Sequence, residues 1–394
     1  MSKLEIDNEF KEFQEDVDNG KYNSPLEVPL EIWGNSSWEL LDKKTLENLL
    51  LPFLNFTFKR AVKVMPIYKG AYKKIQKIES FDDFKSIPIL VKDSTSNTVG
   101  FRNKINENPY TMLPTDIKNN YHIYKSGGTK GTATPTFITP IDREIESRGF
   151  SRAFKYAGFK DSDRVLSTYN PTHKGGEEAK EAMLKIGAAY MPRRLTDTVE
   201  DVINTIKKYK INSIITTQGP ISEGDKVAKG GGISLLSLIE SGQDTLEEYI
   251  DKIVLGGYGV IDEVINWSKT YEKPIASLLG SSEAIPQAGS TLLQTNTKIC
   301  NYNNLHLFNG PHYVEVVKEE DGIIVPVKKG ETGLLVYTTI AREGTIYIRY
   351  APGDEATLIK NESECTCGIK TEIISDIKRI DSPNDIISTG CCVG

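Results

Sequence analysis

The chain has 394 residues, 38% of them hydrophobic and 26% charged, which is typical of a globular protein with room for two or three domains. A formal net charge of −6 argues against a nucleic-acid partner, and no apolar run approaches the length of a membrane span, which argues against a membrane partner. The N-terminal stretch MSKLEIDNEF is polar and acidic, unlike a secretory signal, so we expect a cytoplasmic protein.

The first ninety residues predict helices followed by a short strand. Residues 1–37 are polar and predict a surface arm or short helices. Apolar residues recur near helical spacing over 38–79, and Pro52 predicts a break in this helical stretch. Residues 80–90 predict a helix start and a short strand.

The middle of the chain alternates helices with strands. An amphipathic helix predicted at 141–157 leads to a strand at 164–169. The further predicted segments are helices at 177–186, 199–206 and 260–270 and strands at 188–191, 211–217, 252–257 and 274–280. This alternation indicates βαβ units and a mostly parallel sheet, which binds ligands beyond the carboxyl ends of its strands. Two predicted strand ends, 255–257 and 279–283, are small and contain glycine, as ligand loops do.

From about residue 305 the pattern becomes that of an antiparallel sheet. Short alternating strands, separated by Gly, Asp and Lys turns, are predicted at 312–317, 322–327, 333–339 and 345–350. We therefore predict an α/β fold: a large N-terminal domain with parallel sheets flanked by helices, plus a small antiparallel β-subdomain.

The stretch YKSGGTKGTATPT, residues 124–136, has two interpretations. Backbone N–H groups of a glycine-rich turn can converge on phosphate oxygens, and Lys130 would add a cation. The same composition also suits a flexible linker. The spacing is not that of a Walker A loop, so composition alone leaves both interpretations open.

Four ordered stretches resemble the motifs of the adenylate-forming superfamily, which includes acyl-CoA synthetases and adenylation domains. SGGTKGTATPT resembles its S-G-T-T-G-x-P phosphate loop, and LLGSSEA at 278–284 resembles Y-G-x-T-E. IRYAPGDEATL at 348–358 resembles R-Y-x-T-G-D, and DIKRID at 376–381 is similar to the hinge motif G-R-x-D. The resemblance runs from about residue 45 to the end, and the phenylacetate-CoA ligase branch fits best.

The resemblance implies an ATP site and a role for each matching residue. A phosphate loop would hold the β- and γ-phosphates, and Glu283 would help to hold Mg²⁺. Asp354 would accept hydrogen bonds from the ribose hydroxyls, and Arg379 would contact the ribose or the phosphates. The remaining nucleotide-binding residues would be Ser126, Gly127, Gly128, Thr129 and Lys130 in the loop, Gly256 and Gly257 at the adenine, and Ser281 and Ser282 near the α-phosphate. The implied catalytic residues are Glu283, Lys130 and His173.

Each of these residues also has a purely structural interpretation. Asp354 could be a turn aspartate, Glu283 could cap a helix, and His173 could be an ordinary loop histidine. The loop also departs from the family pattern, because Gly128 stands where a threonine is usual. Leu279 likewise replaces a tyrosine that normally lies against adenine. These departures allow either a remodelled nucleotide site or a degenerate one.

The cysteines predict a structural zinc site near the β-subdomain. Cys300, His306, Cys365 and Cys367 would form a Cys₃His set, which suits tetrahedral Zn²⁺. The C-x-C spacing is tighter than the usual C-x₂-C, and His312 is a competing ligand. The alternative is buried free thiols beside a surface histidine.

The domain organisation follows from the resemblance. Residues 1–90 would be a helical segment of the adenylation domain, 91–300 its α/β core, 301–375 the β-subdomain and 376–394 the hinge and tail. In the superfamily a mobile C-terminal domain follows the hinge and supplies a lysine, whereas this sequence ends thirteen residues after Asp381. Either the chain has been shortened there, or the protein works without that domain, perhaps with a partner subunit in its place.

The predicted function is ATP- and Mg²⁺-dependent activation of a small carboxylic acid to an acyl-adenylate. Transfer to CoA, a carrier thiol or an amine would follow. One alternative is a self-acylating acyl-protein synthetase that uses Cys391 or Cys392 as acceptor. The other is a non-catalytic nucleotide- or acyl-binding subunit.

Overall fold

The computed structural model divides the chain into two compact units. The first unit comprises residues 1–145 and 307–394, and the second comprises residues 146–306. The residues that the structure describes are 5–72, 75, 77–93, 98–126, 133–218, 222–223, 226–227, 233–256, 260–284, 288–289, 303–360, 365 and 367–380.

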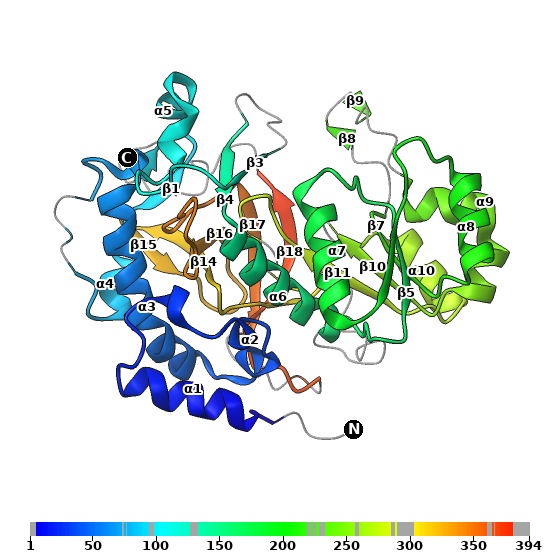
Figure 1. Cartoon of the computed structure of the whole chain (residues 1–394), viewed down its shortest axis with the longest axis horizontal. Coiled ribbons are helices and arrows are strands. Elements are labelled where there is room, and N and C mark those ends of the chain that lie inside the picture. The colour runs from blue at the N-terminus through cyan, green and yellow to red at the C-terminus, as the bar shows by residue number, and fades with distance from the viewer. Residues whose placement is uncertain are drawn as a thin grey trace. The chain divides into compact units, whose positions relative to one another are not determined.

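The second unit is a parallel sheet with helices packed on it (Figure 1). Its strands follow the order β12-β11-β10-β7-β5-β6, and only the short β12 runs antiparallel to its neighbour. The strands are β5 (Arg164–Ser167), β6 (Ala189–Pro192), β7 (Ser213–Thr216), β10 (Lys252–Gly256), β11 (Ile275–Leu279) and β12 (Ala288–Gly289), with a separate hairpin of β8 (Ser222–Glu223) and β9 (Lys226–Val227). The helices are α7 (Lys174–Ile186), α8 (Val199–Tyr209), α9 (Leu235–Tyr249) and α10 (Asp262–Thr270).

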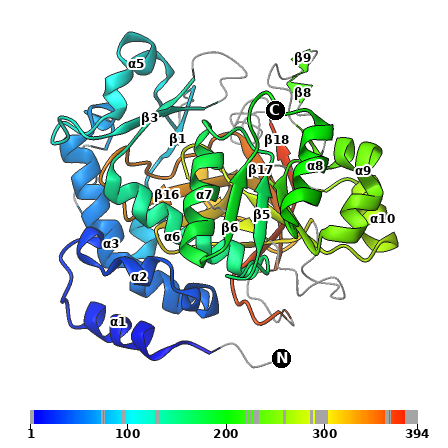
Figure 2. The ribbon, with the colours of Figure 1, turned by 45° about the vertical axis from the view of Figure 1, so that its right-hand side comes forward.

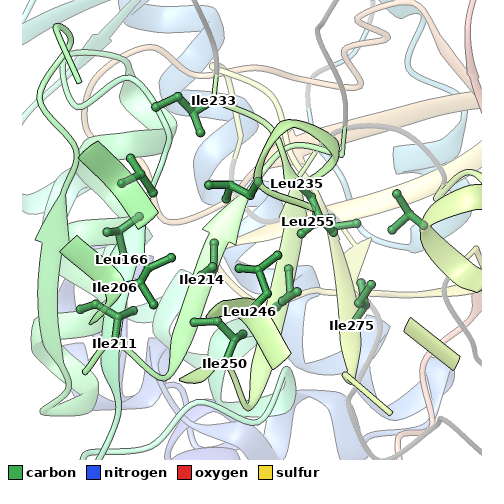
Figure 3. Packing of buried hydrophobic residues seen from close by; sticks show 14 of the residues in the cluster. Leu166, Ile206, Ile211, Ile214, Ile233, Leu235, Leu246, Ile250, Leu255 and Ile275 are labelled. Carbon is green, nitrogen blue, oxygen red and sulfur yellow. The ribbon is translucent and has the colours of Figure 1, made fainter. Parts of the chain in front are cut away.

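The core of the second unit lies between these helices and the sheet (Figure 3). Ile206 of α8, Ile214 of β7 and Leu246 of α9 are among its fully buried residues. Helix α9 approaches α8 so closely that a Cβ on Gly242 would lie 2.4 Å from Cδ1 of Ile203. Gly242 also departs from helical geometry, with φ −156°. The glycine therefore gives up helix propensity for close packing of the two helices.

The first unit contains the antiparallel part of the fold. Its main strands are β14 (His312–Glu320), β15 (Ile323–Pro326), β16 (Thr332–Thr339), β17 (Asp354–Lys360) and β18 (Ile373–Arg379), which follow the order β15-β14-β16-β17-β18. The strand β13 (Leu305–Leu307) lies beside β18, where the Leu307 N–H donates to the Glu372 carbonyl at 2.9 Å. Two further pairs are β1 (Ile89–Val91) with β2 (Thr98–Gly100), which is parallel, and β3 (His122–Lys125) with β4 (Pro135–Ile138), which is antiparallel.

Helices of the first unit come almost entirely from the N-terminal third of the chain. They are α1 (Asn8–Asp18), α2 (Leu30–Trp33), α3 (Lys43–Val64), α4 (Phe81–Lys85) and α5 (Arg102–Glu107), with 3₁₀ turns at Pro25–Glu27, Ser36–Leu40, Pro66–Tyr68 and Pro109–Met112. Figures 1 and 2 both place α1 and α2 beside α3. The long helix α6 (Pro140–Tyr156) then carries the chain from the first unit into the second.

The predicted α/β fold class is confirmed, and three local predictions are wrong. Pro52 does not break the helix, because α3 runs straight through it with Leu49 and Phe53 buried on either side. Residues 345–350 form no strand and make only isolated bridges through Tyr350, next to Arg349 with its left-handed φ of 46°. The helix α9 was not predicted at all. In each case burial against neighbouring elements outweighs local propensity.

The N-terminal segment also differs from a surface arm. It does form short helices, but Phe10, Phe13 and Trp38 pack edge-on or tilted against one another with centroids 5.0–5.8 Å apart. These rings belong to the core of the first unit. Among the helices of the described residues, none combines the length and apolar character needed to cross a membrane.

Candidate functional site

The carboxyl ends of the parallel strands in the second unit carry a cluster of polar side chains. Thr168, directly after β5, and Thr216, at the end of β7, share a buried hydroxyl–hydroxyl hydrogen bond of 2.7 Å. Arg193 follows β6 and donates from Nε to the Thr168 carbonyl at 2.6 Å. Parallel sheets commonly bind ligands at this edge, which makes it the candidate ligand edge of the second unit.

Tyr169 reaches along this edge from β5 to the end of β10. The Gly256 N–H donates to its phenol oxygen, and burial raises the pKa of the Tyr169 hydroxyl well above its usual range. A Cβ on Gly256 would lie 1.6 Å from that oxygen, so only glycine leaves room for the phenol. The sequence predicted Gly256 at the adenine; the structure adds Tyr169 as its neighbour. Gly257 lies outside the described residues.

His173 is the N-cap of helix α7, and the Glu283 carboxylate influences its pKa. Its Nδ1 accepts the Gly175 N–H at 3.2 Å, which leaves the hydrogen of the neutral ring on Nε2. Desolvation, and then the Lys174 cation, lower the pKa of His173, while the carboxylates of Glu177 and Glu283 act in the opposite direction. The imidazole is therefore neutral at pH 7 and can donate a hydrogen bond from Nε2.

Glu283 follows β11 in a tight turn. The Ser281 N–H donates to the Ala284 carbonyl at 3.0 Å, and the Ala284 N–H donates to the Ser281 hydroxyl at 3.3 Å. This turn holds Glu283 and Ser282 in buried positions. The predicted residues His173 and Glu283 are more than a hundred residues apart in the sequence. In the second unit they lie close enough for the Glu283 carboxylate to affect the pKa of His173.

The predicted phosphate loop is the turn of the β3–β4 hairpin in the first unit. Ser126 closes its base: its N–H donates to the Thr134 carbonyl at 3.0 Å, and its hydroxyl accepts the Thr134 N–H at 2.9 Å. Gly127, Gly128, Thr129 and Lys130 lie outside the described residues. The described residues on either side of this segment pair as strands β3 and β4, as expected within a folded unit and not in an interdomain linker.

The predicted ribose carboxylate and the predicted hinge arginine are paired. Asp354 and Arg379 lie opposite each other at the open end of the β17–β18 hairpin, and Nη1 of Arg379 donates to Oδ1 of Asp354 at 3.0 Å. The Ile380 N–H also donates to the Gly353 carbonyl at 2.9 Å, which fixes the backbone beside the carboxylate. Gly353 itself has a φ of 107°, a left-handed conformation that favours glycine.

Arg349, in the same motif as Asp354, anchors this segment from inside the first unit. Its guanidinium donates to Oε1 of Glu315 at 2.7 and 3.2 Å and to the Ile87 carbonyl at 2.7 Å, and it also contacts the Lys85 carbonyl. The side chain is fully buried. Sequence reasoning gave Arg349 no role, and its only signal was the position in the R-Y-x-T-G-D-like stretch.

Three of the four predicted metal ligands converge. Their ligand atoms, from His306, Cys365 and Cys367, lie within 4.8 Å of one another, and all three side chains are buried. Two thiols and one imidazole form a soft donor set that fits Zn²⁺. Cys300 lies outside the described residues, and His312 does not belong to this group.

Comparisons with known proteins agree with this geometry. No family model matches the chain. Phenylacetate-coenzyme A ligase of Escherichia coli (strain K12) is 23% identical over 331 residues, which cover 80% of this chain and 67% of that protein. A structure of 2-hydroxyisobutyryl-CoA ligase with 2-HIB-AMP and CoA in the thioesterification state superposes with a TM-score of 0.70 at 17% identity, over 88% of this chain and 70% of that one. The chain therefore has the fold of these adenylate-forming ligases.

The open conformation of the same 2-hydroxyisobutyryl-CoA ligase superposes with a TM-score of 0.69 at 15% identity, over 88% of this chain and 77% of that chain. These structural likenesses confirm the predicted fold, and the similarity to phenylacetate-coenzyme A ligase agrees with the predicted resemblance. The similar proteins named here are CoA ligases. The individual roles of the site residues remain predictions.

Proposed function

We propose that this adenylate-forming ligase uses ATP and Mg²⁺ to activate a carboxylic acid and then passes the acyl group to a thiol, with CoA as the first candidate. The names of its relatives support the thiol, since both are CoA ligases. The observation that carries the proposal is Asp354, a buried carboxylate paired with Arg379 at the position that the superfamily uses for ribose.

In the proposed reaction the substrate carboxylate attacks the α-phosphorus of ATP. A new C–O–P bond forms, the bond between the α-phosphorus and the bridging oxygen breaks, and pyrophosphate leaves with both electrons of that bond. The thiolate then attacks the acyl carbon and releases AMP. Positioning and charge stabilisation carry the first step, so no covalent enzyme nucleophile is needed.

The residues of the second unit suit the acid side of this reaction. The Nε2–H of neutral His173 would donate to the reacting carboxylate and orient it without protonating it. Glu283 would hold Mg²⁺, which supplies charge neutralisation to the leaving pyrophosphate. Ser281 and Ser282 would lie near the α-phosphate, and Gly256 and Gly257 near the adenine.

The residues of the first unit suit the remaining parts of the nucleotide. Asp354 would accept from the ribose hydroxyls, because a fixed carboxylate offers several lone pairs to a diol. The loop from Ser126 to Lys130 would hold the β- and γ-phosphates through backbone N–H groups and the lysine cation.

We also propose that His306, Cys365 and Cys367 hold a structural Zn²⁺, with Cys300 as the fourth ligand. A closed set of four protein ligands leaves no open position for a substrate, so the ion would stabilise the fold and take no part in catalysis. The acceptor cysteines of the self-acylation alternative, Cys391 and Cys392, lie outside the described residues. That alternative therefore rests on the sequence alone.

The test is exchange of labelled pyrophosphate into ATP, measured across a panel of aryl, fatty and amino acids. We expect acid-dependent exchange, and Glu283→Gln should lower it on the order of 100-fold because a charged ligand of the metal is lost. Glu177→Gln is the matched control, since the Glu177 carboxylate also raises the pKa of His173 but belongs to helix α7 and to none of the predicted motifs.

Two outcomes would decide against this proposal. Absence of exchange with every acid, while ATP still binds, would leave the non-catalytic binding subunit. Exchange that survives Glu283→Gln but falls with Glu177→Gln would remove Glu283 from the role assigned to it. Mass spectrometry of the intact chain after turnover separates transfer to CoA from self-acylation.

A further inference from the structure

At the open end of the β17–β18 hairpin, the Arg379 guanidinium contacts the Asp354 carboxylate, which is the proposed acceptor for the ribose hydroxyls. Asp354 and Arg379 are directly opposed in the antiparallel register, so their side chains emerge on the same face of the sheet. The guanidinium donates from Nη1 to Oδ1 of Asp354 at 3.0 Å. In this arrangement Oδ1 already receives an N–H where a ribose hydroxyl would have to donate.

The two partners differ in how firmly they are held. The Asp354 side chain is only 7% exposed, whereas that of Arg379 is 41% exposed. The backbone beside the carboxylate is fixed by the hydrogen bond from Ile380 to Gly353. Arginine has a long side chain with many rotamers, so the guanidinium can leave at little cost while the carboxylate stays in place.

We propose that Arg379 acts as an internal competitor for ribose and thereby makes the site selective for phosphorylated nucleosides. This inference rests on the nucleotide site of the proposed function. A ribose diol must displace the guanidinium from Asp354. A nucleoside carries no phosphate, so it gains no ion pair with the displaced Arg379 guanidinium. A nucleotide offers phosphate oxygens to the displaced guanidinium, which binds them with charge-assisted hydrogen bonds.

The proposal predicts affinity changes of opposite sign in one variant. In Arg379→Gln the competitor and the cation are lost together. Adenosine should then bind about five- to tenfold tighter, because the competitor is gone. ATP escapes the same competition but loses the charge-assisted contact, which is worth more, so it should bind several-fold weaker. A purely structural ion pair would instead shift both affinities in the same direction, by displacing Asp354.

The experiment is isothermal titration of the full chain with adenosine, 2′,3′-dideoxyadenosine and ATP with Mg²⁺. Dideoxyadenosine lacks the diol, so its affinity should be the same in the wild type and in Arg379→Gln. Lys378→Gln is the matched control: it removes an equal charge from the neighbouring exposed position of β18, which projects from the opposite face. Arg379→Lys keeps the charge and tests whether the guanidinium geometry matters.

Three results would overturn the proposal. The first is a change of the same sign for adenosine and ATP in Arg379→Gln, and the second is an equal change in Lys378→Gln. The third is a wild-type protein that binds neither ligand, which rejects the nucleotide site as well. In the first two cases ATP binding that is weakened by Asp354→Asn still supports the nucleotide site, so the two failures are distinguishable. Thermal unfolding of each variant checks that the fold persists.

Discussion

The two ends of the β17–β18 hairpin belong to the same pair of strands and carry two different kinds of candidate site. Cys365 and Cys367 lie in the connection between the strands, where both side chains are buried together with His306. Asp354 and Arg379 lie at the open end, where the acid is buried and the base is 41% exposed. The connection suits a ligand that is bound permanently, and the open end suits one that exchanges.

In the proposed function, side-chain exposure would distinguish the structural metal site from the nucleotide site. A buried soft donor set gains nothing from solvent access and stabilises the fold once an ion binds. A pair with one mobile, half-exposed partner can open to a ligand without unfolding its surroundings. Substitutions at the connection and at the open end should therefore differ in their effects on stability and on ATP binding.

The largest effect is expected at the connection. Replacing both thiols in Cys365→Ser/Cys367→Ser should remove about one bound Zn²⁺ per chain and lower the Tm on the order of 10 °C, because metal binding contributes directly to folding. Metal analysis of the purified chain and differential scanning calorimetry provide the measurement. Cys391→Ser/Cys392→Ser is the control and should keep both the metal and the Tm. A wild-type chain without zinc would remove this half of the contrast.

A substitution at the open end of the hairpin should weaken ATP binding and leave the fold intact. Asp354→Asn should weaken ATP binding by about 10- to 100-fold, since a charged hydrogen-bond acceptor is lost, with little change in Tm. Asp376→Asn is a suitable control, because Asp376 is an exposed acid on the same strand. If Asp354→Asn lowered the Tm as much as the cysteine changes do, Asp354 would have a structural role like that proposed for the cysteines.

The backbone beside the carboxylate should matter to both fold and binding. Gly353→Ala would place a side chain at φ 107°, which costs about 1–2 kcal/mol of unfolding free energy, and the nearest atom to its Cβ is 3.7 Å away. The cost therefore comes from backbone conformation and not from crowding. Gly330→Ala is the matched control, with φ 86° and no atom within 4 Å. We expect similar losses in urea denaturation, but weaker ATP binding only for Gly353→Ala.

The smallest effect concerns pH near the connection. Burial raises the pKa of Glu372 above its usual value near 4.5, although the Lys43 cation acts against the shift, and Glu47 and Glu315 add to it. The folded chain thus holds this proton where the unfolded chain has lost it. Its contribution to stability is present below pH 4.5 and falls as the pH rises through the raised pKa.

Glu372→Gln should remove this pH dependence. The difference in unfolding free energy between the wild type and the variant should change over that window by about 1.4 kcal/mol for each unit of the shift. Chemical denaturation at several pH values measures it. The ion pair of Glu372 with Lys43, at 2.8 Å, is also lost in the variant, so Lys43→Gln serves as the control. A difference that rises with pH would contradict the assigned sign.

Much of the second unit follows from sequence periodicity. Predicted strands and helices from 164 to 280 match β5, β6, β7, β10 and β11 and the helices between them, because buried parallel strands are short continuous apolar runs. The exception is α9, whose Gly242 lowers local helix propensity. Its close approach to Ile203 is a tertiary contact that compensates for that loss.

The candidate site likewise contains residues that the sequence predicted and residues that only the structure revealed. Ordered motifs pointed to Glu283, Asp354 and Arg379, and the cysteine spacing pointed to Cys365 and Cys367. Neither pattern contained Tyr169, which is paired with the Gly256 N–H across the strand ends, and the motif that contained Arg349 did not predict its role as a buried anchor. Those residues are set by which strands become neighbours, and periodicity does not encode strand order.

The sequence by itself determined the α/β class, the resemblance to the adenylate-forming enzymes and the chemical types present at each candidate site, because local periodicity and short motifs carry that information. Only the tertiary structure decided that Arg379 opposes Asp354 and that His306, and not His312, meets the two thiols of the hairpin. Contacts between residues far apart in the chain depend on strand register and burial, which arise when the elements pack.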